Sequence, residues 1–170
     1  MLLRAEEDDD HASVYAVNSS AFDTPSEANL VNALREQARP LISIVTEDDG
    51  KILGHILFSP VSLSGNPRLE LVGLAPMAVV PEHQRLGIGS ALVREGLKQC
   101  RQFRQRGFAG VVVLGHPAYY PRFGFLPASR FGIDSEYGVP DDTFMAMELQ
   151  SGALNGISGR AKYHPAFDGV

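Results

Sequence analysis

The chain has 170 residues, 44% hydrophobic and 21% charged, a composition typical of a folded globular domain rather than a disordered or fibrous chain. Its formal net charge of −5 argues against general nucleic-acid binding, because such domains usually carry a basic face. The acidic start MLLRAEEDDD does not resemble a signal peptide, no apolar run is long enough to span a membrane, and the one cysteine, Cys100, excludes an intramolecular disulfide. We therefore expect one cytoplasmic domain, residues 1–170, with no nucleic-acid or membrane partner.

The first 40 residues predict a short strand and two helices. Leu2 to Arg4 favours a strand, and Asp8 to Asp10 place carboxylates at the start of a helix that reaches about Asn18. A second helix begins at Thr24-Pro25-Ser26-Glu27, which offers an N-cap, a proline at the first helical position and a capping-box glutamate. Pro40 ends this helix.

The middle of the chain predicts a three-stranded antiparallel meander. Residues Leu41 to Thr46 and Lys51 to Val61 alternate like strands, and Asp48-Asp49-Gly50 between them is a strong hairpin signal. A loop at Leu63 to Arg68 leads to the third strand, Glu70 to Val80.

The second half predicts a helix between two parallel strands and a less regular end. After Gly89 an amphipathic helix runs to a stop at Gly107, and Val111 to Leu114 forms a buried strand. A helical crossover makes this strand parallel to the one before the helix. We expect a short helix or turn around residues 115–125, a loop at Ser135 to Asp142, a strand at Phe144 to Leu149, and a final strand with a loose tail within Gly152 to Val170.

The junction of the third strand and the long helix predicts an anion site. The first amides of a helix have no acceptor within it, and the helix dipole adds partial positive charge, so a phosphate fits there. The P-loop pattern fails because Ser90-Ala91 follow Gly89 where lysine is required, and the dinucleotide pattern G-x-G-x-x-G fails at Leu92.

Two motifs carry a family resemblance. Gln84-Arg85-x-Gly87-x-Gly89 resembles the acyl-CoA-binding motif Q/R-x-x-G-x-G/A of the GNAT family (GCN5-related N-acetyltransferases), near its small bacterial members. Tyr120-Pro121-Arg122-Phe123-Gly124-Phe125 resembles the Y-x-x-x-G-F segment of the same family. The resemblance covers most of Leu2 to Leu149. It implies a mixed α+β fold with a central, mostly antiparallel sheet flanked by helices, in which the parallel strands at Glu70 to Val80 and Val111 to Leu114 splay apart around the cofactor.

The same resemblance implies acetyl-CoA as co-substrate and direct transfer to an amine in a ternary complex. It places the pyrophosphate on the stretch Gln84, Arg85, Leu86, Gly87, Ile88, Gly89 and Ser90. Pro76 lacks an amide hydrogen and so marks an edge or a bulge, although it could also begin a shorter strand. In the family the pantetheine arm pairs with such a bulged strand, which implies main-chain contacts at Met77, Ala78 and Val79.

The resemblance assigns the departing thiolate to Tyr120, because a phenol can donate a proton as that charge develops. The attacking amine must be neutral, so a general base is expected. Glu70, on the strand that leads to the cofactor, and His116, at the end of the next strand, are the candidates, whereas Glu82 is expected to face solvent. The five histidines are scattered without metal-ligand spacing, so we predict no metal.

Two alternatives in other functional classes remain open. One is a non-catalytic acyl-CoA-binding sensor or regulatory module, in which Tyr120 would be dispensable. The other is a nucleotide-phosphate binder of another fold. The acceptor can be a small-molecule amine or a protein amine, and a homodimer is as open as a monomer.

Overall fold

The computed structural model describes residues 1–170, and its fold divides into two units that we describe separately. Unit 1 comprises Met1–Ser59, Ala75–Lys98 and His164–Val170, and unit 2 comprises Pro60–Leu74 and Gln99–Tyr163. Three elements contribute to both units: strand β3 (Lys51–Leu63), strand β4 (Leu71–Val79) and helix α3 (Ile88–Gln102).

The strands of unit 1 follow the predicted order. β1 (Leu2–Ala5) pairs antiparallel with β2 (Ile42–Asp48), and β2 pairs antiparallel with β3, which neighbours β4. Asp49 and Gly50, between β2 and β3, both have positive φ angles, 51° and 76°. Two consecutive positive φ angles are typical of the tight hairpin turn that the sequence predicted. β4 continues through Pro76, so the alternative of a shorter strand beginning there is wrong.

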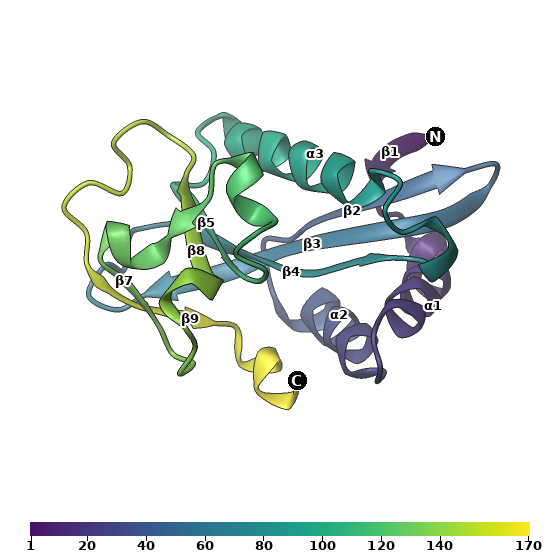
Figure 1. Cartoon of the computed structure of the whole chain (residues 1–170), viewed down its shortest axis with the longest axis horizontal. Coiled ribbons are helices and arrows are strands. Elements are labelled where there is room, and N and C mark those ends of the chain that lie inside the picture. Colours follow the sequence, from purple (N-terminus) through teal and green to yellow (C-terminus); the bar gives the residue numbers. More distant parts are fainter. The chain divides into compact units, whose positions relative to one another are not determined.

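The helices of unit 1 cover both faces of its strands (Figure 1). Helices α1 (His11–Ala21) and α2 (Ser26–Gln37) pack on one face, where Val14 and Leu34 join Val45 and Leu57 in a buried cluster. The first part of α3 packs on the other face. There, a Cβ atom on Gly96 would lie 2.3 Å from Cε1 of Phe58, so the helix approaches β3 only because residue 96 is a glycine.

Two details at the N-terminus of unit 1 differ from the prediction. The first helix begins at His11, after a 3-10 turn at Asp8–Asp10 that forms a capping box between Glu7 and Asp10. At α2 the expected capping box is absent, and Thr24 instead accepts a hydrogen bond from the Ser26 amide at 3.3 Å. Acidic residues before a helix can cap a turn or form an ion pair with a basic side chain, and their spacing in the sequence does not distinguish these two roles.

The tail of unit 1 is not loose, in contrast to the prediction. A 3-10 turn at Pro165–Gly169 packs against α2, and Ala166 and Phe167 join the α1–α2 core. Two adjacent apolar side chains explain this packing, and two residues are too few to show a hydrophobic period in a glycine-containing segment that favoured a loop.

The strands of unit 2 confirm the predicted parallel pair. β4 pairs parallel with β5 (Gly110–Leu114), with Leu71 opposite Gly110, and β5 pairs antiparallel with β8 (Phe144–Glu148). Three further strands complete this part of the sheet: β6 (Leu126–Pro127) on β8, β9 (Gly159–Tyr163) on the end of β3, and β7 (Ile133–Ser135) parallel to β9. β6 and β7 are too short to show a period in the sequence and were not predicted.

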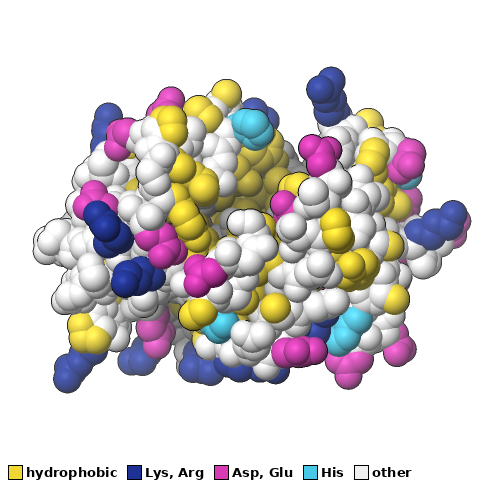
Figure 2. Space-filling model, turned by 90° about the horizontal axis from the view of Figure 1, so that it is seen from below, with side chains coloured by type: hydrophobic (Ala, Val, Ile, Leu, Met, Phe, Trp, Pro, Cys, Tyr) yellow, Lys and Arg dark blue, Asp and Glu magenta, His cyan; other side chains and the backbone are white.

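The remaining regular segments are short 3-10 turns, at Pro81–His83, Phe103–Gln105, Tyr120–Phe123, Ala128–Phe131 and Asp141–Thr143. Figure 2 shows basic and acidic side chains interspersed over the face that it draws. None of the helices has the length and apolar character needed to cross a bilayer.

Candidate active site

In unit 1 the predicted pyrophosphate turn is an exposed bend between β4 and α3. The Gln84 side chain donates to the carbonyl of Val79 at 3.0 Å, which ties the bend to the end of β4. Arg85 and Gly87 have positive φ angles of 64° and 91°. A Cβ atom at Gly87 would meet nothing within 4 Å, so the space beside this backbone is open. The side chain of Leu86 is 68% exposed, so it does not pack against the core.

The start of α3 supplies the donors that an anion needs. The first hydrogen bond of this turn runs from the Ala91 amide to the carbonyl of Gly87 at 3.0 Å. The amides of Gly87, Ile88 and Gly89 precede it and so have no acceptor within the helix. Since α3 begins at Ile88, the dipole of the long helix also favours an anion at this turn.

A glycine in β3 positions this helix start. A Cβ atom on Gly54 would lie 3.0 Å from both Cγ2 of Ile88 and Cδ1 of Leu92. Ile88 and Leu92 are buried, so the motif residue Ile88 anchors the turn in the core while its neighbours stay open. Of the strand residues predicted to face the pantetheine arm, Ala78 is buried and Met77 and Val79 are half-buried.

In unit 2 Tyr120 is buried among aromatic rings directly after the end of β5. Its ring makes edge contacts with Tyr119 and Phe125, at centroid distances of 5.1 and 5.7 Å. A Cβ atom on Gly115 would lie 2.4 Å from Cε2 of Tyr120, so the glycine makes room for the ring. Burial raises the pKa of the Tyr120 phenol to about 12, with a smaller contribution from Tyr119. The phenol therefore stays protonated at neutral pH and can act as a proton donor.

A second tyrosine with a perturbed phenol, the half-buried Tyr163 on β9, was missed by the sequence analysis. Its ring packs where a Cβ atom on Gly73 of β4 would lie 2.6 Å from Cε2. Burial raises the pKa of Tyr163, and the neighbouring Tyr137, Glu136 and Tyr120 add to the shift. No local motif marks Tyr163, because the β3–β9 pairing that positions it joins segments about 100 residues apart in the chain.

The two candidate bases of unit 2 lie at opposite ends of β5. Glu70 is exposed just before β4, and its carbonyl accepts from the Ala109 amide at 2.9 Å, beside the start of β5. His116 follows the end of β5, and its carbonyl accepts from the Tyr119 amide at 3.1 Å. Since a strand rises about 3.3 Å per residue, the two ends of β5 are roughly 13 Å apart. His116 thus lies at the Tyr120 end of the strand, and Glu70 does not.

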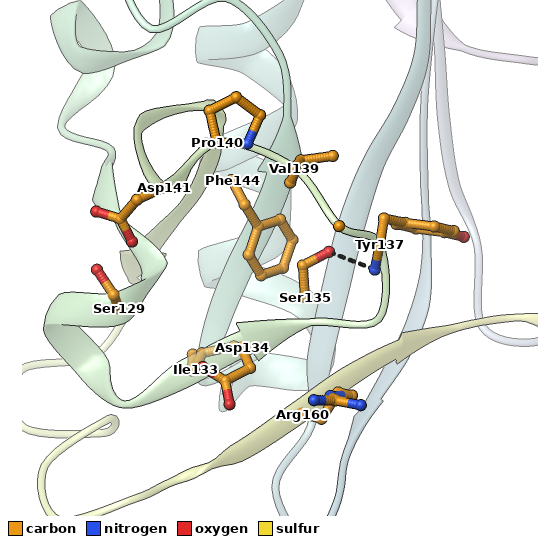
Figure 3. A pocket seen from close by; sticks show the side chains of 11 residues that line it. Ser129, Ile133, Asp134, Ser135, Tyr137, Val139, Pro140, Asp141, Phe144 and Arg160 are labelled. Atoms are coloured by element: carbon orange, nitrogen blue, oxygen red, sulfur yellow. Dashed lines mark hydrogen bonds between the residues drawn. The ribbon is translucent and has the colours of Figure 1, made fainter.

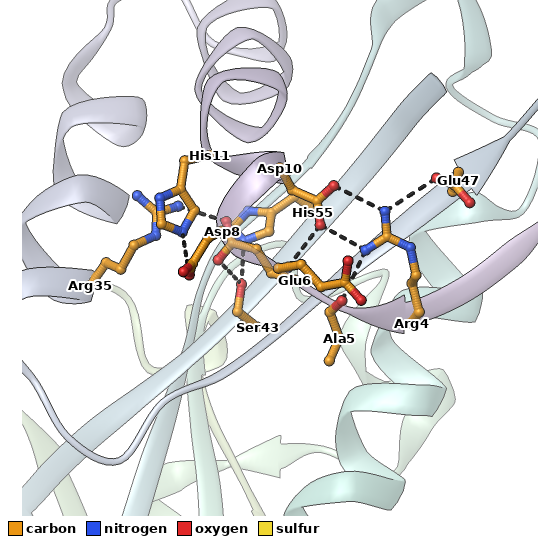
Figure 4. Close-up of polar contacts among 11 residues, drawn as sticks. Arg4, Ala5, Glu6, Asp8, Asp10, His11, Arg35, Ser43, Glu47 and His55 are labelled. Carbon is orange, nitrogen blue, oxygen red and sulfur yellow. Dashed lines mark hydrogen bonds and ion pairs between the residues drawn. The ribbon is translucent and has the colours of Figure 1, made fainter. Parts of the chain in front are cut away.

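Unit 1 also contains a buried polar network that the sequence gave no reason to expect (Figure 4). The Asn18 amide donates to Nδ1 of His55 at 3.1 Å, so the imidazole proton is on Nε2, which donates to Ser43 Oγ at 2.9 Å. Ser43 donates to Glu6 at 2.8 Å, and Arg35 donates to the other oxygen of Glu6 at 2.6 Å. Both nitrogens of His55 are engaged and its side chain is inaccessible, so the network links β2, β3, α1, α2 and Glu6 after β1 rather than facing a substrate.

Neither the cysteine nor any metal-binding cluster adds chemistry. Cys100 is buried in α3, and burial raises the pKa of its thiol to about 12, which suppresses the reactive thiolate. No group of three His, Cys, Asp or Glu side chains is arranged to hold a metal ion.

Comparison with known proteins shows what the whole chain is similar to. Residues 6–125 match the model of the Acetyltransferase (GNAT) family. The chain is 37% identical over 169 residues to the uncharacterised N-acetyltransferase YhbS of Escherichia coli K12, covering 99% of each chain.

Two solved structures extend the likeness to the fold. The crystal structure of E. coli YhbS in complex with CoA superposes with a TM-score of 0.90 at 36% identity, covering 98% of this chain and 91% of that one. A GNAT acetyltransferase of Brucella melitensis in complex with acetyl-CoA superposes with a TM-score of 0.78 at 35% identity, covering 98% and 97%. Sequence, fold and motif therefore agree, and the chain belongs to the GNAT family of acetyltransferases.

Proposed function

We propose that this protein transfers the acetyl group of acetyl-CoA directly to the amine of an acceptor. The observation that carries the proposal is the exposed bend at Gly87, with open space beside it and helix-start amides around it. Relatives that cover nearly the whole chain were solved with CoA and with acetyl-CoA. In this proposal Gln84 to Ser90 hold the pyrophosphate, and the backbone of Met77, Ala78 and Val79 pairs with the pantetheine arm.

The proposed reaction needs one proton donor and one proton acceptor. The amine nitrogen attacks the thioester carbonyl, the new C–N bond forms, the C–S bond breaks, and the sulfur leaves as a thiolate. Tyr120 donates its phenolic proton to that sulfur, and the amine proton passes to a base or to water. We favour His116 over Glu70 as this base, because His116 lies at the Tyr120 end of β5. The phenolate recovers its proton from solvent before the next turnover.

The proposal also covers the domain organisation and the cellular location of the protein. We propose that residues 1–170 form one functional domain, since β3, β4 and α3 each contribute residues to both units. We also propose that the protein works in the cytoplasm, because its one cysteine is a buried, free thiol.

Calorimetric titration of acetyl-CoA into the purified protein tests the cofactor site. We expect micromolar binding, and we expect Gly87→Glu to abolish it, because the substitution puts bulk and negative charge where the pyrophosphate belongs. Gly156→Glu is the matched control: Gly156 also has a positive φ angle, 71°, and nothing within 4 Å of its Cβ position.

The outcomes separate the alternatives. Binding that is lost in Gly87→Glu and kept in Gly156→Glu supports the site. Absence of binding by the folded wild type overturns the proposal. Binding without acetylation of any amine identifies a sensor module instead.

A further inference from the structure

Unit 2 contains a cavity outside the residues assigned so far (Figure 3). It encloses about 380 Å³, within the range of small-molecule sites. Most of its accessible lining is polar, and buried Ile133 on β7 and Phe144 at the start of β8 contribute apolar atoms to it. The polar and charged lining side chains are Ser129, Asp134, Ser135, Tyr137, Asp141 and Arg160.

The wall of this cavity is held in place by the chain itself. The Tyr137 amide donates to Ser135 Oγ at 2.9 Å, and the Tyr163 amide donates to Glu136 at 3.0 Å, which ties the 136–140 loop to β9. At the other end of the loop, the Thr143 hydroxyl donates to the carbonyl of Pro140 at 2.7 Å. A preformed cavity costs little ordering on binding, as ligand sites require.

The charges on the rim have opposite signs and are separated. In Figure 3, Asp141 and Ser129 lie on one side of the Phe144 ring and Arg160 lies on the other. Neither Asp141 nor Arg160 forms an ion pair within the chain. Asp134 lies opposite Arg160 in the β7–β9 register, so its negative charge reduces the positive potential near Arg160, but the two side chains form no ion pair. A ligand with a cationic group and an anionic group at its two ends complements this arrangement.

The cavity lies at the same end of the sheet as Tyr120. Phe144 is opposite Leu114, the last residue of β5, and the Gly115 amide donates to the carbonyl of Thr143 at 2.9 Å. The Tyr120 ring packs on that same Gly115. The strand that begins at Phe144, β8, is therefore the direct neighbour of β5, the strand that leads to the proposed proton donor.

We infer that this cavity binds the acceptor of the proposed reaction, and that the acceptor is a small amino acid with an apolar side chain. This inference rests on the proposed function. The ammonium form docks at Asp141 and Ser129, the carboxylate docks at Arg160, and the side chain packs on Ile133 and Phe144. The ammonium group must lose a proton before it attacks, so docking at Asp141 precedes transfer of that proton to the base.

Calorimetry with L-leucine, L-methionine and L-phenylalanine tests the inference, alongside assays of acetylation of each. Phenethylamine, which lacks the carboxylate, and 3-phenylpropionate, which lacks the amine, are the matched probes. Asp141→Asn and Arg160→Gln remove one charge each. Asp142→Asn and Arg130→Gln are the controls, because these exposed neighbours do not line the cavity.

We expect at least one amino acid to bind and to be acetylated. Asp141→Asn and Arg160→Gln should each weaken its binding by about tenfold or more, the usual effect of losing a charge-assisted hydrogen bond, and the controls should not. Arg160→Gln should leave phenethylamine binding unchanged, since that probe has no carboxylate to lose.

The inference fails if none of the three amino acids binds, if the two charge-removing variants bind as the wild type does, or if a bound amino acid is not acetylated. Acetyl-CoA titration of the same variants keeps the two proposals distinguishable. Intact acetyl-CoA binding with no amino-acid binding overturns the cavity assignment alone, whereas a wild type that binds no acetyl-CoA overturns both.

Discussion

His55 in unit 1 and Tyr120 in unit 2 are both buried titratable side chains, yet they are held differently. His55 is fully inaccessible, and hydrogen bonds from Asn18 and to Ser43 occupy both of its ring nitrogens. Tyr120 is 8% exposed and is positioned by ring contacts with Tyr119 and Phe125. Burial is the main cause of the pKa shift of both groups.

The difference shows why a shifted pKa alone does not identify a catalytic residue. Desolvation shifts the pKa of any buried group, whether it supports the fold or the chemistry. What separates the two is the state of the polar atoms. Both nitrogens of the His55 imidazole are hydrogen-bonded inside the fold, whereas aromatic packing fixes the ring of Tyr120 through its carbon atoms, and in our proposal the phenol oxygen serves a reacting group.

The largest effect we predict is a loss of stability in mild acid that depends on His55. Burial lowers the pKa of His55 to about 4 from its ordinary 6.5, so the unfolded chain takes up the proton at a higher pH than the folded one. This contribution is fully present above pH 6.5 and is lost as the pH falls toward 4, by about 3 kcal/mol in all and about 2 kcal/mol between pH 7 and 5. Urea unfolding at several pH values measures it.

His55→Gln separates this group from the carboxylates. The variant lacks the titrating imidazole, so most of the change between pH 7 and 5 should disappear. Asp10 does not contribute to the stability change between pH 7 and 5. The hydrogen bond from Arg4 lowers the pKa of the Asp10 carboxyl, so its own effect on stability lies in more acidic solution. An unchanged pH dependence in His55→Gln would show that His55 is not the group responsible.

A smaller effect is predicted for crowding the Tyr120 ring with Gly115→Ala. The added Cβ would lie 2.4 Å from Cε2 of Tyr120, so the ring must move. Overpacking of this kind costs about 1–3 kcal/mol, and we expect a lower urea midpoint together with lower turnover. Gly169→Ala is the control, since nothing lies within 4 Å of its Cβ position. A variant with wild-type stability and turnover would mean that the ring position does not matter.

The sequence predicted the features that depend on neighbours in the chain. The hairpin at Asp49-Gly50, the parallel β4–β5 pair and the long helix, which was expected after Gly89 and begins at Ile88, all follow from local turn chemistry and hydrophobic period. The Gly87 bend belongs to the same class, because the amides that we propose as its anion donors belong to the start of the helix that directly follows it.

Features that depend on distant segments could not be predicted in this way. The His55 network joins β2, β3, α1, α2 and Glu6, and the cavity of unit 2 forms among short segments that carry no period. Glu70 shows the same limit for a residue that the sequence analysis did single out. The sequence placed it on the strand that leads to the cofactor, but Glu70 lies just before β4, and the β4–β5 register was needed to show that it lies at the far end of β5 from Tyr120.

The smallest effect that we predict, in free energy, is that of removing the hydroxyl oxygen of Tyr120. This substitution tests the comparison between His55 and Tyr120 most directly. Tyr120→Phe keeps the ring and its packing, so stability and acetyl-CoA affinity should change little. Turnover should fall at least about tenfold, equivalent to about 1.4 kcal/mol of transition-state stabilisation, because the leaving thiolate loses its proton donor. Steady-state kinetics with the acetylated amine, beside acetyl-CoA titration, measures both quantities.

Tyr119→Phe provides the matched control, since Tyr119 is the adjacent phenol and its ring packs edge-on against the Tyr120 ring, with the two centroids 5.1 Å apart. If the two variants lose turnover equally, the effect comes from the aromatic cluster as a whole and the Tyr120 hydroxyl has no separate role. Full activity in Tyr120→Phe would remove the proton-donor assignment. A selective loss in Tyr120→Phe with unchanged stability would show that this buried group, unlike His55, is kept for chemistry, because a hydroxyl that supported the fold could not be removed without lowering the free energy of unfolding.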